Sequence, residues 1–377
     1  MNFSISKRVL YNALTTVVRA ISPAAPVPSL SGVKIDVLTD RVILTGSDSN
    51  ISIMTEIKES KADDPVQNEL MILEEGSVVI DAKWIIEIVR KMSADIITFE
   101  TIDGTLTLIK GGSIEFKING MRAIDYPRID FTIDTPSFKM NTKMLSDIVK
   151  QTAFACSDKE TRPALTGVNF KAKDNTLLCN ATDSYRLATK KFNVEYPDTF
   201  NITIPAKTLS EIHNTVADEL EFNMAISDTK LFVSTGNTII RTRLIEDQYP
   251  DTTRLIPPSF TQELKIDAKE LLNAVDRASF IKSDGKSVVK MTINQETMDI
   301  STSNQEVGSS HETLSVISFT GNPITISCSG NYLIDAIRAI STKEVTLSFS
   351  GELRPIIITS DEDKSLVQLV SPVRTYN

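Results

Sequence analysis

Hydrophobic and polar residues follow the same pattern in three separate parts of the chain. Each part first alternates apolar and polar residues, as a strand does, and then changes to the three-to-four-residue period of a helix. A short polar residue stands at each change, and such residues favour the N-cap because a side-chain oxygen can accept an orphan amide bond. The segments are residues 3–10, 138–145 and 264–271, with Ser6, Asn141 and Asp267 at the changes.

The apolar positions predict which face of each helix is buried. In the first helix they recur every three to four residues through about five turns. The second and third copies repeat the beginning of this pattern. The positions are Val9, Leu10, Ala13, Leu14, Val17, Val18 and Ile21, then Leu145, Ile148 and Val149, then Leu271, Ala274 and Val275.

One constant spacing relates the first two copies beyond these helices. An offset of 135 residues carries Phe3 onto Phe138, residues 28–32 onto residues 163–167, and Asp48-Ser49 onto Asp183-Ser184. Residues 287–293 hold the corresponding strand of the third copy. A fixed period of this size predicts repeated structural units.

A second helix follows in every copy, each time after a β-branched strand. The helices are predicted at residues 84–92, 209–212 and 332–340, and the strands at 78–80, 202–204 and 324–326. Each unit of about 125 residues therefore contains two helices and some eight strands, enough to bury a core of its own. Pro257-Pro258 marks the second boundary. We predict α+β domains at residues 1–130, 131–257 and 258–377.

Composition restricts the function further. The 377 residues are 41% hydrophobic and 24% charged, with a formal charge of -9, which argues against a chain that coats itself with nucleic acid. Three widely spaced cysteines, Cys156, Cys179 and Cys328, predict buried reduced thiols. With no signal-peptide pattern and no apolar span of about 20 residues, we expect a cytoplasmic protein.

Candidate catalytic and metal-binding groups are few. His213 and His311 have no cysteine or second histidine nearby in sequence, and the common phosphate-binding glycine motifs are absent. The acidic runs Asp63-Asp64 and 361–363 are typical of solvated loops. The sequence predicts neither a catalytic site, nor a metal, nor a cofactor.

Basic residues recur on or beside all six predicted helices, although the chain is acidic. Any one of them is typical of a solvated helix face, but together they indicate a positive surface that could contact DNA phosphates without reading sequence. The residues are Lys7, Arg8, Arg19, Lys83, Arg90, Lys91, Lys143, Lys150, Lys207, Lys269, Arg277, Lys282, Arg338 and Lys343.

Several segments together resemble the bacterial DNA polymerase III beta sliding clamps. They are residues 161–167, the Ala-Thr-Asp-Ser-Tyr-Arg-Leu-Ala segment at 181–188, residues 248–251 and the end of the chain at 369–374. The resemblance covers essentially the whole chain. It implies a non-catalytic processivity factor made of three clamp domains, which dimerises head to tail into a six-domain ring around duplex DNA. It also implies nucleoid-associated work with polymerase III alpha, other polymerases, the clamp loader and repair proteins.

The resemblance further implies a pocket for short linear peptides between the second and third domains. Its deep part would be Leu165, Thr182, Ser184, Tyr185, Arg186, Leu187, Pro250, Arg254 and Leu255. Its shallow part would be Arg162, Ala164, Gly167, Leu353, Pro355, Leu369, Val370, Ser371, Pro372, Val373 and Arg374. At the dimer interface, Phe116 and Ile118 would meet Phe280 and Ile281 of the partner. The family usually ends before Thr375.

Two other functions compete with this interpretation. A three-domain enzyme with scattered carboxylates in a cleft would need acid–base residues confined to one unit, and the repeat contains none. A peptide-binding scaffold that does not encircle DNA would have no reason for basic residues on every helix.

Overall fold

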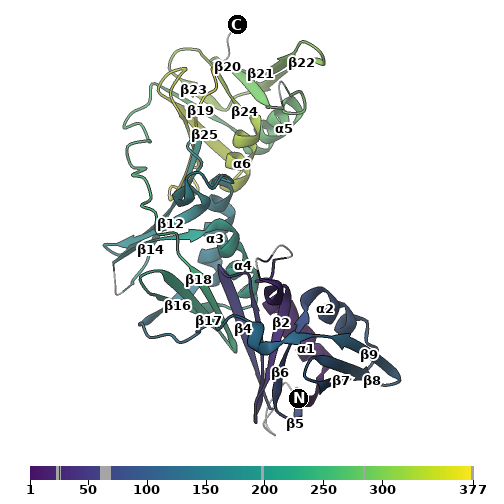
Figure 1. Ribbon diagram of the computed structural model, residues 1–377. Coiled ribbons are helices and arrows are strands. Elements are labelled where there is room, and N and C mark those ends of the chain that lie inside the picture. The colour runs from purple at the N-terminus through teal and green to yellow at the C-terminus, as the bar shows by residue number, and fades with distance from the viewer. Residues whose placement is uncertain (23–24, 26, 60–68, 197–198, 283–284, 375–377) are drawn as a thin grey trace. The chain divides into compact units, whose positions relative to one another are not determined.

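The structure is a computed structural model that describes residues 1–377 except 23–24, 26, 60–68, 197–198, 283–284 and 375–377 (Figure 1). Asp63-Asp64 and the end of the chain after Arg374 lie outside the described residues. The chain forms two compact units, Met1–Thr142 with Ser210–Leu244, and Lys143–Leu209 with Ile245–Asn377. The predicted middle domain contributes strands to both units.

The first unit contains two antiparallel sheets. In the five-stranded sheet the order is β5 (Met71–Glu74), β1 (Asn2–Ser6), β7 (Ile96–Asp103), β8 (Leu106–Gly111) and β9 (Ile114–Asn119). In the nine-stranded sheet the order is β10 (Met121–Arg122), β6 (Gly76–Asp81), β2 (Gly32–Val37), β3 (Arg41–Ser47), β4 (Ile51–Lys58), β18 (Thr238–Arg243), β17 (Lys230–Thr235), β16 (Glu221–Ile226) and β11 (Ser137–Asn141).

The second unit also contains two antiparallel sheets. Its nine-stranded sheet has the order β15 (Phe200–Pro205), β12 (Gly167–Lys173), β13 (Thr176–Thr182), β14 (Arg186–Asn193), β27 (Leu366–Val370), β26 (Ile356–Thr359), β25 (Glu344–Phe349), β19 (Gln262–Asp267) and β23 (Ser318–Thr320). Its four-stranded sheet has the order β22 (Gly308–Ser315), β21 (Thr297–Asn304), β20 (Val288–Ile293) and β24 (Ile324–Ser329).

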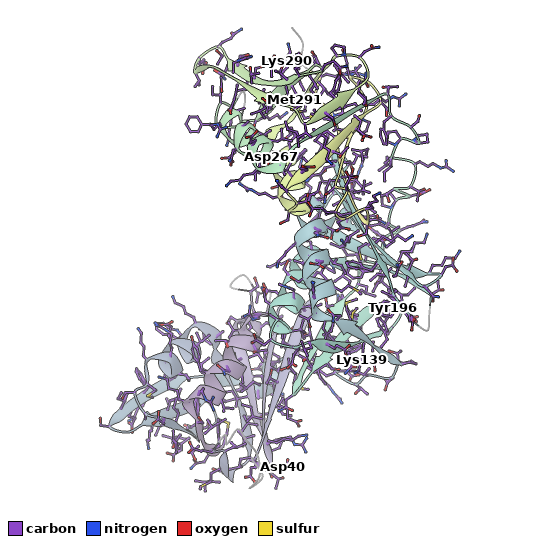
Figure 2. The ribbon with its side chains drawn as sticks, turned by 180° about the vertical axis from the view of Figure 1, so that it is seen from behind. Asp40, Lys139, Tyr196, Asp267, Lys290 and Met291 are labelled. Atoms are coloured by element: carbon purple, nitrogen blue, oxygen red, sulfur yellow. The ribbon has the colours of Figure 1, made fainter. Side chains whose placement is uncertain are left out.

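All six predicted helices are confirmed. They are α1 (Lys7–Val18), α2 (Ala82–Lys91), α3 (Thr142–Thr152), α4 (Ala206–Thr215), α5 (Ala268–Ala278) and α6 (Gly330–Ile340). Asp267, labelled in Figure 2, caps α5 by accepting a bond from the Glu270 amide. Ser6 occupies the N-cap of α1, but its side chain makes no capping bond.

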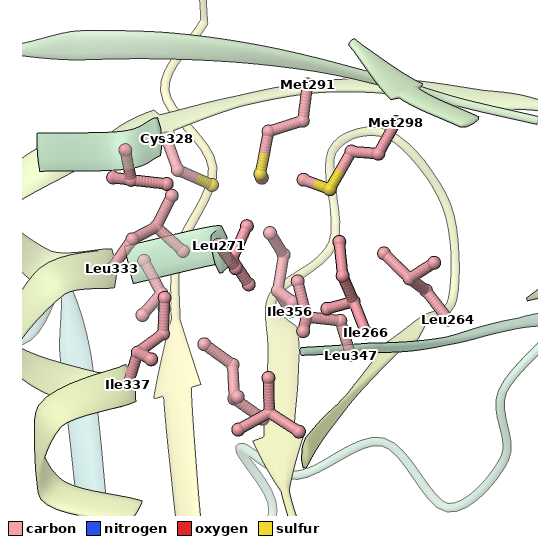
Figure 3. Packing of buried hydrophobic residues seen from close by; sticks show 14 of the residues in the cluster. Leu264, Ile266, Leu271, Met291, Met298, Cys328, Leu333, Ile337, Leu347 and Ile356 are labelled. Carbon is pink, nitrogen blue, oxygen red and sulfur yellow. The ribbon is translucent and has the colours of Figure 1, made fainter. Parts of the chain in front are cut away.

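The helices use the predicted faces for their cores. Leu10, Ala13, Leu14 and Val17 of α1 are buried, and α1 packs beside α2 (Figure 1). In the C-terminal part, α5 and α6 pack together over a core that strands of both sheets complete. Figure 3 shows Leu271 and Ile337 of these helices pointing into this core.

Each nine-stranded sheet continues across a predicted domain boundary. In the first unit β4 of the first repeat pairs with β18 of the second, with Ile53 opposite Ile240. In the second unit β14 of the second repeat pairs with β27 of the third, with Ala188 opposite Gln368. The sequence did not predict these joints, because strand periodicity does not specify the partner strand.

One turn is built identically in all three repeats. The side chain of Asp48 accepts the amides of Asn50 and Ile51, that of Asp183 accepts those of residues 185 and 186, and that of Asn304 accepts those of residues 306 and 307. A short polar side chain of this kind favours such a turn because it bonds its own backbone. The predicted equivalence of Asp48 and Asp183 is confirmed, and Asn304 is its third copy.

The three cysteines are free and buried, as predicted. Burial raises the pKa of the Cys156 and Cys328 thiols to about 12, and it also raises the pKa of Cys179. Because the thiolate is the reactive form, these side chains are chemically inert. In the described part of the chain, no helix is long and apolar enough to cross a membrane.

Candidate functional site

A hollow of about 650 Å³ opens on the second unit, and we call it the Leu255 pocket. The short helix η4 (Pro163–Thr166), the end of β13, the turn after it and the segment 247–255 supply its walls. Seven of the residues assigned by resemblance line it, namely Arg162, Ala164, Leu165, Thr182, Ser184, Pro250 and Leu255.

The turn at Asp183 gives the pocket one of its rims. Ser184 has a φ of 80°, in the left-handed region, and the amide bonds to Asp183 hold it there. Arg162 Nη1 donates to Ser184 Oγ at 3.1 Å, which links the two sides of the opening. Leu255 is 46% exposed, so an apolar side chain is available to a ligand. An apolar hollow with a few fixed polar groups suits a peptide anchored by hydrophobic side chains.

Sequence reasoning missed five residues of the wall. They are Thr161, Pro163, Asp247, Gln248 and Asp251. All five lie in or beside the two segments quoted for the resemblance, so continuity along those segments could have found them. Asp247 and Asp251 give the opening negative charge as well as the positive charge of Arg162.

Other residues assigned to the peptide site lie in the protein core. Leu187 pairs with Leu369 across β14 and β27, and both side chains are buried. Val370 is buried as well. At Gly167 a Cβ would come within 2.5 Å of the Ile204 carbonyl oxygen, so this glycine serves strand packing. These residues are buried and do not line the pocket.

The last four assigned residues, 371–374, follow strand β27. Ser371 donates its amide to the Tyr185 carbonyl, and Val373 donates its amide to the Ser327 carbonyl. These bonds and the isolated bridge between Cys328 and Pro372 hold the segment that follows β27. Of the assigned residues, Tyr185, Arg186, Arg254, Leu353, Pro355, Ser371, Pro372, Val373 and Arg374 do not line the Leu255 pocket.

Basic residues recur at the same helix positions in different repeats. The second residue of the first helix is Arg8, Lys143 or Lys269. The second residue of the second helix is Lys83 or Lys207, and its ninth residue is Arg90 or Arg338. All seven side chains are exposed. Lys7 differs, because it is half-buried and donates to the Met92 carbonyl.

The basic excess is concentrated on the first repeat. Helices α1 and α2 together contain five Lys or Arg residues and one acidic residue. Helices α3 and α4 contain three Lys or Arg residues and two acidic residues, and α5 and α6 contain three of each kind. Acidic neighbours also bind some of the cations, such as Glu312, which accepts from Arg277. The expected bias towards positive charge is therefore strong in the first repeat and absent from the helices of the third.

Of the four residues assigned to a dimer interface, Phe116 and Phe280 are exposed, whereas Ile118 and Ile281 are half-buried. Phe116 and Ile118 belong to β9, an edge strand, and they line a hollow of about 430 Å³ with Trp84 and Ile88, which we call the Trp84 pocket. Phe280 follows α5 and is 85% exposed. Sequence reasoning missed Trp84, although an exposed tryptophan on a helix is a signal for a contact surface.

No metal-binding cluster is found in the described part of the chain. It contains no group of three or more His, Cys, Asp or Glu residues placed to hold a metal ion. The run at 361–363 lies in a loop with residues 361 and 362 exposed, as predicted, and two of its carboxylates also bind lysines. Asp363 accepts a bond of 2.5 Å from the buried Lys190, and Asp361 pairs with Lys265.

The three repeats, each with two helices over antiparallel sheets, match one class of protein, the DNA clamps. Family models of the DNA polymerase III beta subunit match residues 1–130 (N-terminal domain), 139–251 (central domain) and 253–374 (C-terminal domain). The chain belongs to this family, the beta sliding clamps. It is a DNA sliding clamp, a non-catalytic processivity factor of DNA polymerase III, as its resemblance had implied.

Individual relatives agree over the full length. The chain is 36% identical to the beta sliding clamp of Bacillus subtilis and 35% identical to that of Staphylococcus aureus, with all of each chain covered. A crystal structure of the Bacillus subtilis clamp matches with a TM-score of 0.94 over 100% of both chains. The beta chain from Streptococcus pneumoniae, 33% identical, also gives 0.94, over 99% of this chain and 100% of that one.

Proposed function

We propose that two copies of the chain join head to tail into a ring around duplex DNA, and that partner proteins dock short peptides in the Leu255 pocket. Polymerase III alpha, other polymerases, the clamp loader and repair proteins are the partners that the family resemblance suggests, in the cytoplasm at the nucleoid. The observation that carries the ring is the pair of internal strand joints, β4 with β18 and β14 with β27.

Two edge strands are the counterparts of those joined strands. By position in their repeats, β22 corresponds to β4 and β14, and β9 corresponds to β18 and β27. Both β22 and β9 are at the edge of their sheets, so their outer backbone groups can pair with another strand. Joining the four-stranded and five-stranded sheets of two copies would give a third nine-stranded sheet, like the two within the chain.

The repeat also gives the expected register. Phe3, Phe138 and Leu264 are equivalent residues on the first strand of each repeat. From each of them, the residues directly opposite on successive strands lead to β9, β18 or β27. The residues reached there are Phe116, Ile240 and Gln368, in that order. In the two internal joints, Ile240 and Gln368 lie opposite Ile53 and Ala188, each the fifth residue after its turn aspartate.

The fifth residue after Asn304 is Ser309. We therefore expect Ser309 of one copy opposite Phe116 of the other, and Val307 opposite Ile118.

The proposed joint between copies differs chemically from the internal ones. Phe280 and Val307 are exposed, and they occupy the positions of Arg19 and Arg186 in earlier repeats. Arg19 and Arg186 bind acids on the next repeat's second helix, Glu211 and Asp335. The equivalent acid on α2, Glu87, accepts instead from Arg90 of its own helix. Burial of apolar side chains, Phe280 in the partner's Trp84 pocket above all, would hold the copies together.

The dimer has a direct test. Phe280→Asp should convert the protein to monomers at micromolar concentration, because it places a charge where an aromatic ring would be buried. Solution mass by light scattering measures the change. Leu220→Asp is the matched control, since Leu220 is 87% exposed and lies outside the proposed joint. A Phe280→Asp variant that stays dimeric would contradict this interface.

The DNA-facing surface predicts unequal contributions from equivalent residues. Arg8→Glu should weaken binding to a short blunt duplex about tenfold at low salt and reduce its salt dependence, because it removes a cation from the most basic helix pair. Lys269→Glu, at the same helix position of the third repeat, should have a smaller effect. Fluorescence anisotropy against salt concentration measures both. Equal losses would mean that the local charge excess does not direct DNA contact.

The peptide site is tested at Leu255. Leu255→Asp should weaken binding of a hydrophobic peptide at least tenfold, because burying one leucine contributes about 1.5–3 kcal/mol. The probe is the tightest-binding member of a set of fluorescein-labelled hexapeptides with Leu or Phe at two positions. Ile124→Asp, at an exposed residue that does not line the pocket, is the control. Unchanged affinity of Leu255→Asp would place the peptide elsewhere.

A further inference from the structure

The side chain of Arg186 lies inside a network that connects the rim of the Leu255 pocket to helix α6. It is only 13% exposed. Its Nε donates to Asp183 Oδ2 at 3.0 Å and its Nη1 donates to Asp335 Oδ2 at 2.6 Å. Asp183 belongs to the turn after β13, whereas Asp335 belongs to α6 of the next repeat. The guanidinium therefore joins two repeats of the second unit.

Aromatic rings cover this guanidinium. Its central carbon is 4.5 Å from the ring centroid of Tyr332 on α6 and 5.4 Å from that of Phe154, in the short helix η3 (Ala153–Ala155). Both distances are in the range of cation–π attraction. Two carboxylates and two rings surround the guanidinium, and Arg186 is not part of the wall of the Leu255 pocket.

Asp183 connects Arg186 to the turn that forms the pocket rim. One of its carboxylate oxygens binds Arg186, while the other accepts the amides of Tyr185 and Arg186 and so holds Ser184 at the rim. Arg162 binds the Ser184 hydroxyl from the opposite side of the opening. The carboxylate that shapes the rim is thus also the one that binds Arg186.

The turn occurs in all three repeats, but the arginine occurs in only one of them. In the first repeat Asp48 makes the same turn, yet the residue equivalent to Arg186 is the apolar Ile51. In the third repeat it is Val307, after the turn at Asn304. The turn therefore forms without a cation. Arg186 is special to the repeat that carries the Leu255 pocket.

We propose that Arg186 is a positioning residue for peptide binding, which acts by tying the pocket rim to α6 through Asp335 and does not touch the peptide. This role rests on the proposed peptide site. It differs from the direct contact that the family resemblance implied for Arg186. The two roles make different predictions for Asp335, which is 38% exposed and lies outside the wall of the Leu255 pocket.

The test is a double-mutant cycle on peptide affinity, read by anisotropy with the same fluorescent hexapeptide. Asp335→Asn should weaken binding about fivefold and Arg186→Met about tenfold, and the double variant should be no weaker than Arg186→Met alone. Arg186→Lys should not restore affinity, because an ammonium lacks the planar fork that reaches both carboxylates. Glu211→Gln, at the same position of α4 and paired with Arg19, is the matched control and should bind normally.

Three outcomes would overturn this role. Native affinity in Asp335→Asn together with a loss in Arg186→Met would mean direct contact, and so would losses that add in the double variant. If Leu255→Asp also binds normally, the peptide site itself is misplaced and the role fails with it. Because Asp335 is a partly exposed helix residue, Asp335→Asn should unfold at the same temperature as the native protein. Measuring this thermal unfolding temperature distinguishes a positioning effect from a folding defect.

Discussion

Antiparallel strand pairing across the repeat boundaries is the interaction on which the rest of the structure depends. A strand at the end of a sheet leaves a row of amide and carbonyl groups without partners, and proteins must cover or use such edges. This chain uses two of them internally, where β4 meets β18 and β14 meets β27. Each repeat alone would present one such strand at either side. The proposed pairing of β22 with β9 of a second copy follows from the same constraint.

The side-chain contacts differ from one joint to the next. Between the first two repeats Arg19 pairs with Glu211, and between the next two Arg186 pairs with Asp335 and lies against two rings. At the free ends the corresponding positions are the exposed Phe280 and Val307. A joint that has to open for DNA to enter would then depend on apolar burial, whereas the permanent joints use ion pairs within a continuous chain. The Leu255 pocket lies beside a permanent joint, on the Asp183 turn.

Much of this could be predicted from the sequence, for identifiable reasons. The helices and repeats follow from periodicity and the spacing of 135 residues, and the identical turns follow from Asp48 and Asp183. The joints could not be predicted, because a strand such as β14 specifies its own faces but not its neighbour. For the same reason Leu187 and Leu369 were assigned to a pocket wall, whereas they are opposite each other in a buried strand pair. The direction of the Arg186 side chain was also hidden, since Asp335 is 149 residues away along the chain.

The register of the joint between copies is the most direct test of this account. In the double variant Val307→Cys/Ile118→Cys, directly opposite residues would have Cα atoms about 4.5–5.5 Å apart, a separation that a disulfide spans. The native cysteines are buried and unreactive, so they should not interfere. Under mild oxidation this pair should give covalent dimers in high yield, and Gly308→Cys/Ile114→Cys, displaced by three residues along the strand, should not. Monomers throughout, or more efficient linking of the displaced pair, would contradict the claim that the ring closes by repeating its internal joint.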